Sequence, residues 1–424
     1  MELLKKIKLN RVSIGIIGLG YVGLPLLEGF ASKNLKVIGF DIDKNKITKL
    51  KKGQSYINHI KLNGIHKNKK VVFTSNFKKI SNIDLIILCL PTPLKKNKLP
   101  DLSFIKKTLN SIKKFLKPNQ AISLESTTYP GTTREIIYPF LKKKFDVGKN
   151  FFLIYSPERE DPGRKNILLQ NIPKVLGGYS KTCEKIGKEF YKKFFKKIII
   201  TKNLETAEFS KIFENIFRAV NISLVNEMKF LSEKMKVDFN DVVKVSSSKP
   251  FGFMPFYPGP GIGGHCIPID PLYLSYKASQ YGLKTQLIET SFKVNYETTK
   301  RISRIIIAKT KKDKPRILII GISYKKNIDD VRESPALKII EDLKAKGALV
   351  DYHDPYIKIF PKNRIFFVKM KSKNLNAKML KSYDSVFICT DHDDINYDLI
   401  GKNANQIFDS RNVFKRLSGK VIRV

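Results

Sequence analysis

Three glycines directly after an apolar run restrict the fold of this chain more than any other pattern in it. Val12–Ile17 is apolar, and Gly18-Leu19-Gly20-Tyr21-Val22-Gly23 follows at once and begins a segment with helical spacing. Glycine permits a tight turn from strand to helix and the close approach of a pyrophosphate, while free N–H groups at a helix N-terminus attract anions. This pattern, the glycine loop, predicts a βαβ unit that binds a dinucleotide.

An acidic residue follows the next apolar run, 18 residues after the last of these glycines. Asp41 ends the run Lys36–Phe40, where a carboxylate can accept hydrogen bonds from the hydroxyl groups of an adenosine ribose. We therefore expect NAD as the cofactor. Lys44 and Lys46 lie close by in the sequence and leave NADP open as an alternative.

Apolar runs alternate with helical segments through the first 200 residues. Three further runs are Asp84–Leu90, Ala121–Ser126 and Phe151–Tyr155. Continuous apolar strands joined by helices form a parallel sheet that is covered on both faces. We expect residues 1–203 to form an NAD-binding Rossmann-like domain.

The middle of the chain lacks this alternation. Residues 205–236 contain no Gly or Pro and keep apolar residues at helical spacing, which predicts one long helix that joins domains and contacts a second subunit. A loop dense in Gly and Pro is predicted at 250–271, and a helix at 272–310 with a break at Gly282. We expect residues 204–310 to form a helical dimerisation domain.

A second α/β pattern begins at Pro315. Its predicted elements are strands at 316–320, 348–352, 384–390 and 406–409 and a helix at 335–346. We expect residues 311–424 to form a second Rossmann-like domain. The predicted fold class is therefore α/β, with two doubly wound parallel-sheet domains joined by a long central helix and a helical middle domain.

The segment Pro258–Pro271, the cysteine loop, holds the strongest candidate nucleophile. Cys266 lies where this loop meets the next predicted helix, and a helix N-terminus with a neighbouring positive charge would lower the pKa of its thiol. Asp270, four residues later, can orient water or relay protons. His265 either tunes Cys266 or only shapes the loop, and both interpretations stay open.

The other cysteines have less informative surroundings. We expect Cys89, Cys183 and Cys389 to be buried and inert, because two lie in apolar strands and one begins an amphipathic stretch. The chain has no CxxC pair, which favours a reduced protein.

Four polar residues lie where predicted elements bring them toward a ligand. Lys211 and Asn215 are spaced i, i+4 on one helix face and suit a developing oxyanion, although a solvated lysine is the commoner case. Glu158 follows a strand and can serve as a general base. Thr128 ends a strand at the edge where such sheets bind ligands.

The charge of the chain is unusual. Lys and Arg number 80 against 38 Asp and Glu, a formal net charge of +42, which raises the possibility of nucleic acid or an anionic membrane as partner. The basic residues run along every predicted surface segment and are mostly lysine, so we expect neither partner. No apolar run is long enough to span a membrane, and the N-terminus lacks a signal peptide, so we expect a cytoplasmic protein.

With these residues in place, the chain resembles the UDP-glucose/GDP-mannose dehydrogenase family of nucleotide-sugar 6-dehydrogenases. The resemblance covers essentially the whole chain, in the order of the family's motifs. The matching residues are Gly18–Gly23 with Asp41, Pro91-Thr92-Pro93, Thr128, Glu158, Lys211 with Asn215, Cys266 with Asp270, Tyr324-Lys325-Lys326, Arg332-Glu333-Ser334 and Arg411.

The resemblance implies a role for each of these positions and no metal. Catalysis is expected from Cys266, Lys211, Asn215, Asp270, Glu158 and Thr128. NAD is expected to contact Gly18, Gly20, Tyr21, Val22, Gly23, Asp41, Pro91, Thr92, Thr128 and Glu333. A UDP-sugar is expected to contact Glu158, Arg159, Lys211, Asn215, Gly263, Lys325, Lys326, Arg332 and Arg411.

The resemblance also implies a reaction. Two NAD+ would oxidise a C6 hydroxyl to a uronic acid for surface polysaccharide, through a Cys266 thiohemiacetal and thioester, in a homodimer or larger homo-oligomer. Residues 249–261 and His265 look most like the UDP-N-acetylglucosamine enzymes, with UDP-N-acetylmannosamine and UDP-glucose as alternatives. A more distant alternative is a two-electron hydroxyacid dehydrogenase, which shares the first domain.

Overall fold

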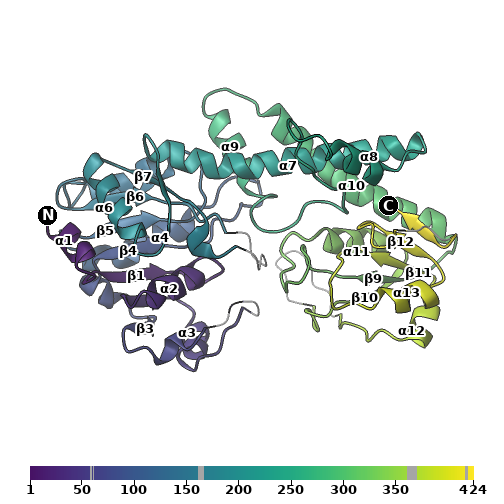
Figure 1. Ribbon diagram of the computed structural model, residues 1–424, viewed down its shortest axis with the longest axis horizontal. Coiled ribbons are helices and arrows are strands. Elements are labelled where there is room, and N and C mark those ends of the chain that lie inside the picture. Colours follow the sequence, from purple (N-terminus) through teal and green to yellow (C-terminus); the bar gives the residue numbers. More distant parts are fainter. Residues whose placement is uncertain (58–59, 61, 161–166, 361–369, 416–418) are drawn as a thin grey trace. The chain divides into compact units, whose positions relative to one another are not determined.

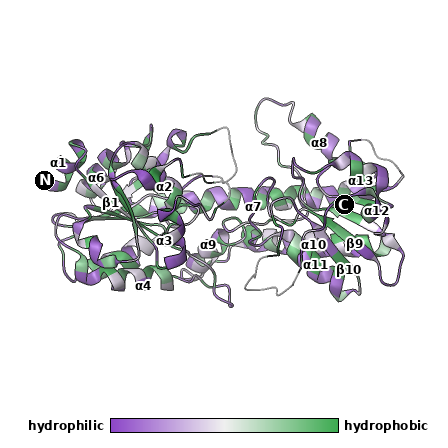
Figure 2. Cartoon of the chain, turned by 90° about the horizontal axis from the view of Figure 1, so that it is seen from below, coloured by the Kyte–Doolittle hydropathy of each residue, from purple (hydrophilic) through white to green (hydrophobic). Residues whose placement is uncertain are grey.

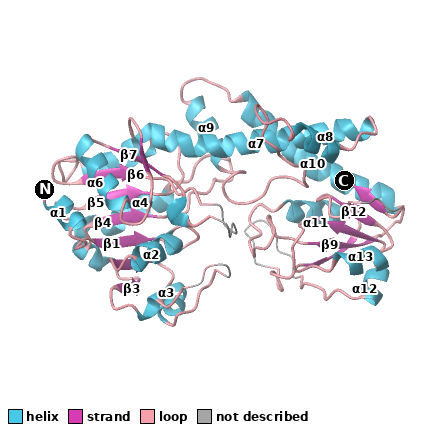
Figure 3. Ribbon diagram, viewed as in Figure 1, coloured by secondary structure: helices cyan, strands magenta, loops and turns pink. Residues whose placement is uncertain are grey.

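The computed structural model describes residues 1–424 except 58–59, 61, 161–166, 361–369 and 416–418. The chain divides into two compact units (Figure 1). The first unit contains residues 1–214 and 272–283, and the second contains 215–271 and 284–424. Each unit is built on one sheet, as Figure 3 shows, and the predicted fold class is confirmed. The division into domains at 1–203, 204–310 and 311–424 stays a prediction.

The first unit holds an eight-stranded sheet in the order β3-β2-β1-β4-β5-β6-β7-β8. Its strands are β1 (Ser13–Ile17), β2 (Lys36–Phe40), β3 (Val71–Thr74), β4 (Leu85–Leu88), β5 (Ala121–Leu124), β6 (Phe152–Tyr155), β7 (Lys174–Gly178) and β8 (Ile198–Ile200). All neighbours are parallel except β6 and β7, which are antiparallel. The sequence predicts five of these strands and misses β3, β7 and β8.

The strand order shows which edge of this sheet is expected to bind ligands. The chain passes from β1 to β2 on one side and then returns to β4 on the other side of β1. In doubly wound sheets ligands bind outside the carboxyl ends of the strands where the order reverses in this way. The glycine loop follows β1, so the fold puts it at this edge.

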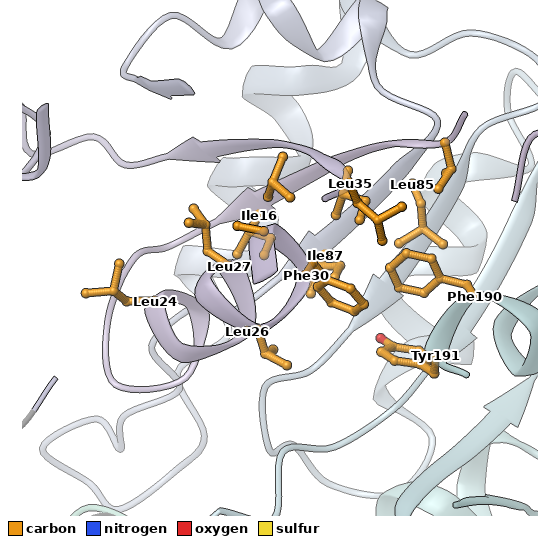
Figure 4. Close-up of a cluster of buried hydrophobic side chains, with 14 of the residues drawn as sticks. Ile16, Leu24, Leu26, Leu27, Phe30, Leu35, Leu85, Ile87, Phe190 and Tyr191 are labelled. Carbon is orange, nitrogen blue, oxygen red and sulfur yellow. The ribbon is translucent and has the colours of Figure 1, made fainter. Parts of the chain in front are cut away.

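The core of the first unit lies between the sheet and the helices that cover it. Figure 4 shows side chains from β1, β4 and two helices meeting in one cluster. Phe30 stacks on Phe190 with ring centroids 4.8 Å apart. Each large apolar side chain buried in this way contributes roughly 1.5–3 kcal/mol, so the apolar strands hold the glycine loop on a rigid base. In Figure 2 the ribbon at β1 is largely green, which marks hydrophobic residues.

The second unit holds a five-stranded sheet, parallel throughout, in the order β10-β9-β11-β12-β13. Its strands are β9 (Arg316–Ile320), β10 (Leu349–His353), β11 (Ser385–Ile388), β12 (Ile407–Asp409) and β13 (Val421–Arg423). The sequence predicts the first four, and β13 is three residues long and gives no pattern. A second apolar core packs around this sheet.

The α-helices include those that the sequence predicts after the glycine loop and at 205–236, 272–310 and 335–346. They are α1 (Glu2–Lys8), α2 (Gly23–Ser32), α3 (Lys44–Lys51), α4 (Ser103–Ile112), α5 (Tyr138–Leu141), α6 (Lys181–Tyr191), α7 (Leu204–Lys234), α8 (Phe239–Ser246), α9 (Asp270–Ser279), α10 (Gln286–Thr310), α11 (Pro335–Ala345), α12 (Ala377–Lys381) and α13 (Tyr397–Asn403). The predicted long helix is α7. The predicted break at Gly282 separates α9 from α10, and its φ of 71° explains the end of the helix. No helix in the described ranges has the length and apolarity of a membrane span.

Candidate functional site

The glycine loop is tightly packed at both ends and open in the middle. Gly18 has φ 93°, and a Cβ on it would lie 2.2 Å from the carbonyl oxygen of Cys89. A Cβ on Gly23 would lie 2.0 Å from the carbonyl oxygen of Gly18. In contrast, a Cβ on Gly20 would meet no heavy atom within 4 Å. The loop therefore requires glycine for its own fold at two positions and leaves space for a ligand at the third.

Asp41 is buried and ties the end of β2 to this loop. Its Oδ2 accepts a hydrogen bond from the N–H of Leu19 at 3.1 Å, and its Oδ1 accepts one from the N–H of Asp43 at 2.9 Å. Lys46 Nζ lies 3.7 Å from Oδ2. Each carboxylate oxygen retains an acceptor site, because it has two lone pairs. A buried acceptor beside an open glycine position fits the ribose and pyrophosphate of NAD, with the N-terminus of α2 supplying N–H donors.

The loops after β4 and β5 carry the other predicted cofactor residues of the first unit. Pro91 is exposed and Thr92 is buried. Ser126 joins the two loops, because its Oγ accepts from the N–H of Leu90 at 2.9 Å and donates to the Leu90 carbonyl at 2.8 Å. The buried Thr128 hydroxyl has no hydrogen-bond partner in the described part of the chain. A buried polar atom without a partner costs stability and fits a position that a ligand completes.

Glu158 follows β6 and is held at both carboxylate oxygens. Oε1 accepts from the N–H of Arg159 at 2.7 Å and of Glu160 at 2.9 Å, and Oε2 lies 3.2 Å from Lys174 Nζ. Lys174 is not predicted from the sequence, because one lysine stands out poorly in a lysine-rich chain. Its only signal is its place at the start of an apolar strand.

The side chains of Arg159 and Lys211 differ in the hydrogen bonds and ion pairs that they make with other described residues. The Arg159 guanidinium pairs with Glu214 at 2.6 Å and donates to the Pro173 carbonyl at 3.0 Å, so its contact with substrate stays a prediction. Lys211 is 6% exposed and makes no hydrogen bond or ion pair with any described residue. The Lys211 side chain is largely buried, which argues against the alternative of a solvated lysine. A lysine in this setting, with no counter-charge among the described residues, suits an anionic ligand.

Asn215 lies one turn of α7 after Lys211 and contacts a second predicted residue. Its Nδ2 donates to Asp270 Oδ2 at 2.6 Å, and its Oδ1 accepts from Arg218. Both side chains of the Asn215–Asp270 pair are fully buried. The structure thus joins two residues that are 55 positions apart in the sequence.

The cysteine loop is held by its backbone at three points. The N–H of Gly259 donates to Asn226 Oδ1 at 2.9 Å, and that of Ile262 donates to Asn295 Oδ1 at 2.5 Å. The N–H of Gly264 donates to the Arg332 carbonyl at 2.9 Å. The loop fixes its position through these contacts while Cys266 remains exposed. Asn226 and Asn295 were missed in the sequence, because both lie in ordinary helical patterns.

The structure bears on the open role of His265 and corrects the expectation for Cys89. Burial, with the charge of Arg332, lowers the pKa of His265 to about 4, which favours a neutral imidazole next to Cys266. This favours the interpretation that His265 shapes the loop. Cys183 and Cys389 are buried as expected, whereas Cys89 is only half-buried because β4 ends one residue before it. Its sulfur still faces the interior, and burial raises the pKa of the thiol.

The predicted ligand residues of the second unit lie on loops at the carboxyl ends of its strands. Gly263 packs so closely that a Cβ would lie 2.6 Å from Tyr324 Cβ and 3.0 Å from the Glu333 carbonyl oxygen. Tyr324 and Glu333 therefore pack against the cysteine loop. Lys325 is half-buried, and the exposed Lys326 pairs with Asp393 at 2.6 Å.

Three further predicted residues are held by ion pairs or backbone contacts. The Arg332 guanidinium forms a bidentate pair with Asp330, whose closest N–O distance is 2.6 Å. Glu333 has φ 48° and lies 3.6 Å from Lys338 Nζ. Arg411 donates from Nε to the Cys389 carbonyl at 2.7 Å.

A cavity of about 540 Å³ in the second unit includes Arg411 in its lining. The lining also contains Lys229, Tyr257, Asp409 and Lys415. This volume suits a small ligand. The basic side chains among its walls suit an anionic one.

The turn after β9 repeats the geometry of the glycine loop. Gly321 has φ 75°, and a Cβ on it would lie 2.3 Å from the Thr390 carbonyl oxygen. Asp354, after β10, accepts from the N–H of Ile322 at 2.8 Å, as Asp41 does from Leu19. Here Ser323 and His392 are buried against Asp354. The second unit therefore reuses the same strand-to-turn geometry with a different set of side chains.

Sequence models for three domains of one family match this chain in order. They are the NAD binding, central and UDP binding domains of the UDP-glucose/GDP-mannose dehydrogenase family, which match residues 12–195, 205–297 and 318–416.

Individual relatives match over most of their length. The UDP-N-acetyl-D-glucosamine 6-dehydrogenase of Pseudomonas aeruginosa is 32% identical over 82% of this chain and 83% of the relative. The UDP-N-acetyl-D-mannosamine dehydrogenase of Methanococcus aeolicus is 33% identical over 92% of this chain and 86% of the relative. The solved structure of a UDP-D-ManNAc dehydrogenase from Pyrococcus horikoshii has a TM-score of 0.87 and 29% identity, and the match covers 97% of this chain and 98% of that one.

Proposed function

This chain belongs to the UDP-glucose/GDP-mannose dehydrogenase family and is an NAD-dependent nucleotide-sugar 6-dehydrogenase, and we propose that its substrate is UDP-N-acetylglucosamine. The residues before Cys266 support this choice, because 249–261 and His265 resemble the UDP-N-acetylglucosamine enzymes more than the UDP-glucose enzymes. Relatives named for UDP-N-acetylglucosamine and for UDP-N-acetylmannosamine are about equally similar. UDP-N-acetylmannosamine is therefore the second candidate, and UDP-glucose the third.

The exposed Cys266, on a loop held at three backbone N–H groups, carries the proposed chemistry. NAD+ bound at the glycine loop would supply the hydride acceptor for each of two oxidations. After the first, the Cys266 thiolate adds to the C6 aldehyde and holds it as a thiohemiacetal, which the second converts to a thioester. Lys211 and Asn215 stabilise the oxygen anion that forms when the thiolate adds.

Hydrolysis of the thioester returns Cys266 to its thiol form and releases the uronic acid. Glu158 takes a proton from the attacking water, and Asp270 positions a water through its place beside Asn215. Thr128 contributes its hydroxyl to the same chemistry and to cofactor binding. One carbon is oxidised by four electrons and two NADH are formed for each substrate.

The second unit is proposed to hold the UDP-sugar. Lys325, Lys326, Arg332 and Arg411 supply positive charge for the diphosphate, and Gly263 allows close approach. Glu333 contacts the cofactor. The match to a UDP binding domain supports this assignment and argues against a two-electron hydroxyacid dehydrogenase.

We also propose that the protein forms a homodimer or larger homo-oligomer through α7. A stripe of apolar side chains on this helix is 42–59% exposed and consists of Phe209, Phe213, Phe217, Leu224 and Leu231. Their spacing of four and seven residues keeps them on one face of the helix. A contiguous exposed apolar face of this kind indicates a protein interface. Surface polysaccharide synthesis is the proposed use of the product.

A panel of sugar nucleotides tests the proposal. Purified enzyme is supplied with NAD+ and each of UDP-N-acetylglucosamine, UDP-N-acetylmannosamine and UDP-glucose, and NADH and uronate are counted. We expect two NADH per UDP-N-acetylglucosamine and little turnover of UDP-glucose. Preference for UDP-N-acetylmannosamine would select the second candidate, and one NADH per substrate would contradict the four-electron reaction.

A further inference from the structure

A buried polar network surrounds Glu158 in the first unit, and the proposed roles leave its other members unused. These members are Ser123 and Glu125 at the end of β5, Lys174 at the start of β7 and Tyr191 at the end of α6. Each of the four side chains is no more than 2% exposed, and Glu158 itself is 8% exposed. Burying ionised groups this far from water lowers stability unless they are paired. A paired buried network of this kind is therefore a candidate for a functional role.

Lys174 is the centre of the network. Its Nζ donates to Glu125, to Glu158 Oε2 at 3.2 Å and to the Pro157 carbonyl at 3.2 Å. Burial alone would lower the pKa of Lys174, but the attraction of Glu125 and Glu158 outweighs it and raises the pKa. The ammonium is therefore charged, and all three of its N–H donors are occupied.

The antiparallel strand β7 explains why this lysine faces Glu158. The pairs Ile154–Gly178 and Tyr155–Gly177 run in opposite directions, and continuing the register sets Glu158 opposite Lys174. A parallel β7 would place the start of the strand, and Lys174 with it, at the other edge of the sheet. The only antiparallel pair among the described strands thus brings a cation to the ligand-binding edge.

Glu125 provides a second carboxylate for the same ammonium. It accepts a hydrogen bond from the Tyr191 hydroxyl, which lies 2.7 Å from Ser123 Oγ. Burial, opposed by Lys174, raises the pKa of Glu125 to about 7. When Glu158 takes up a proton from water and loses its charge, Lys174 still faces Glu125 and is not left as an isolated buried cation.

We propose that Lys174, held by Glu125, is a positioning residue that fixes the Glu158 carboxylate in the orientation for activating the water that hydrolyses the Cys266 thioester. The proposal rests on the role of Glu158 given under the proposed function. Lys174 donates a hydrogen bond to one oxygen of the Glu158 carboxylate, and two backbone N–H groups donate to the other oxygen. These contacts restrict the rotation of the carboxylate. Such restraint keeps the catalytic lone pair aimed at one place.

The variants are chosen so that the fold survives. Lys174→Met alone leaves the Glu125 and Glu158 carboxylates close together in the core without a cation between them, which can destabilise the fold. The informative protein is therefore the double variant Lys174→Met with Glu125→Gln. Glu125→Gln alone measures the contribution of the second carboxylate, and Glu158→Gln gives the effect of losing the base. Lys185→Met, on the exposed side of α6, is the matched control. Circular dichroism checks that each protein is folded.

Rapid mixing with NAD+ and the sugar nucleotide that the panel identifies separates the steps. We expect the folded double variant to keep a fast burst of NADH, to turn over about a hundredfold more slowly in the steady state, and to accumulate a covalent sugar-nucleotide adduct on Cys266 by intact mass. Glu125→Gln should slow the steady state less than the double variant, and Lys185→Met should match the native enzyme.

Three outcomes would overturn the proposal. One is a double variant that turns over as fast as Glu125→Gln alone, because the ammonium would then contribute nothing. The second is an equal loss of burst and steady state, which would assign the network to the fold or to hydride transfer. If Glu158→Gln turns over normally, the role of Glu158 itself fails, and the positioning role fails with it. That last result is distinguished from the other two by the variant that shows it, because the first two concern only the double variant and leave the role of Glu158 intact.

Discussion

Asn215 donates a hydrogen bond from Nδ2 to Asp270 Oδ2 over 2.6 Å, and both side chains are fully buried. This donor helps to stabilise the buried Asp270 side chain, because a buried polar group that loses a hydrogen bond is costly. Asn215→Leu keeps the volume and removes the donor. We expect the free energy of unfolding to fall by about 2 kcal/mol and turnover to fall by at least about a hundredfold, measured by urea denaturation and NADH formation.

Asn221 offers a matched control for that change. It lies on the same helix, is partly exposed, and among the described residues donates only to the carbonyl of Phe217 within its own helix. Asn221→Leu should change the free energy of unfolding by about 0.5 kcal/mol or less and leave turnover unaltered. Equal losses in both variants would show that the Asn215–Asp270 pair has no special role.

Alanine substitutions at Gly18 and Gly20 are expected to change different properties of the protein. The first should lower stability, and the second should weaken NAD+ binding. Gly18→Ala puts a methyl group 2.2 Å from a backbone oxygen at φ 93°, and we expect it to destabilise the first unit by at least about 2 kcal/mol. Gly20→Ala meets no protein atom, so the melting temperature should hardly change. If NAD+ occupies this space, its KM should rise about tenfold or more, equivalent to roughly 1.4 kcal/mol. An unaltered KM in Gly20→Ala would place the pyrophosphate elsewhere.

Cys266→Ser tests the covalent mechanism. A hydroxyl is a far weaker nucleophile than a thiolate, so the aldehyde is not trapped and no thioester forms. We expect uronate formation to fall by more than about a thousandfold, as followed by mass spectrometry and NADH counting. Cys183→Ser is the control, because its sulfur accepts the N–H of Leu153 at 3.3 Å and a hydroxyl can accept the same bond. Normal uronate formation by Cys266→Ser would rule out the thiohemiacetal.

The neutral state of His265 predicts a pH dependence of stability. The pKa of this imidazole is about 4 in the folded protein and near 6.5 when unfolded. Between these values the unfolded chain binds a proton at His265 and the folded chain does not, so acidification through this window lowers the free energy of unfolding. The contribution is at most about 3 kcal/mol.

His265→Gln removes that contribution. The difference in unfolding free energy between variant and native protein should be constant above pH 7.5 and should move in favour of the variant from pH 6.5 toward pH 4. Chemical denaturation across this range measures it. A difference that stays flat over the whole range would show that His265 binds its proton equally in both states.

Much of the site follows from spacing along single elements. Gly18, Gly20, Gly23 and Asp41 stand out because a strand, a turn and a helix fix their geometry within a few residues. Lys211 and Asn215 share a helix face for the same reason. Their burial does not follow from the sequence, because it depends on what packs against α7.

The sequence by itself determined the two α/β patterns, the long helix, the cofactor loop and the position of the candidate nucleophile Cys266, since each depends on local periodicity or on glycine and proline. Only the tertiary structure decided which distant side chains meet: Asp270 on Asn215, Asn226 and Asn295 on the cysteine loop, and Lys174 on Glu158. The direction of β7 shows the reason. Its five residues have no pattern that distinguishes parallel from antiparallel pairing, so the lysine beside Glu158 is set by the path of the chain through the fold.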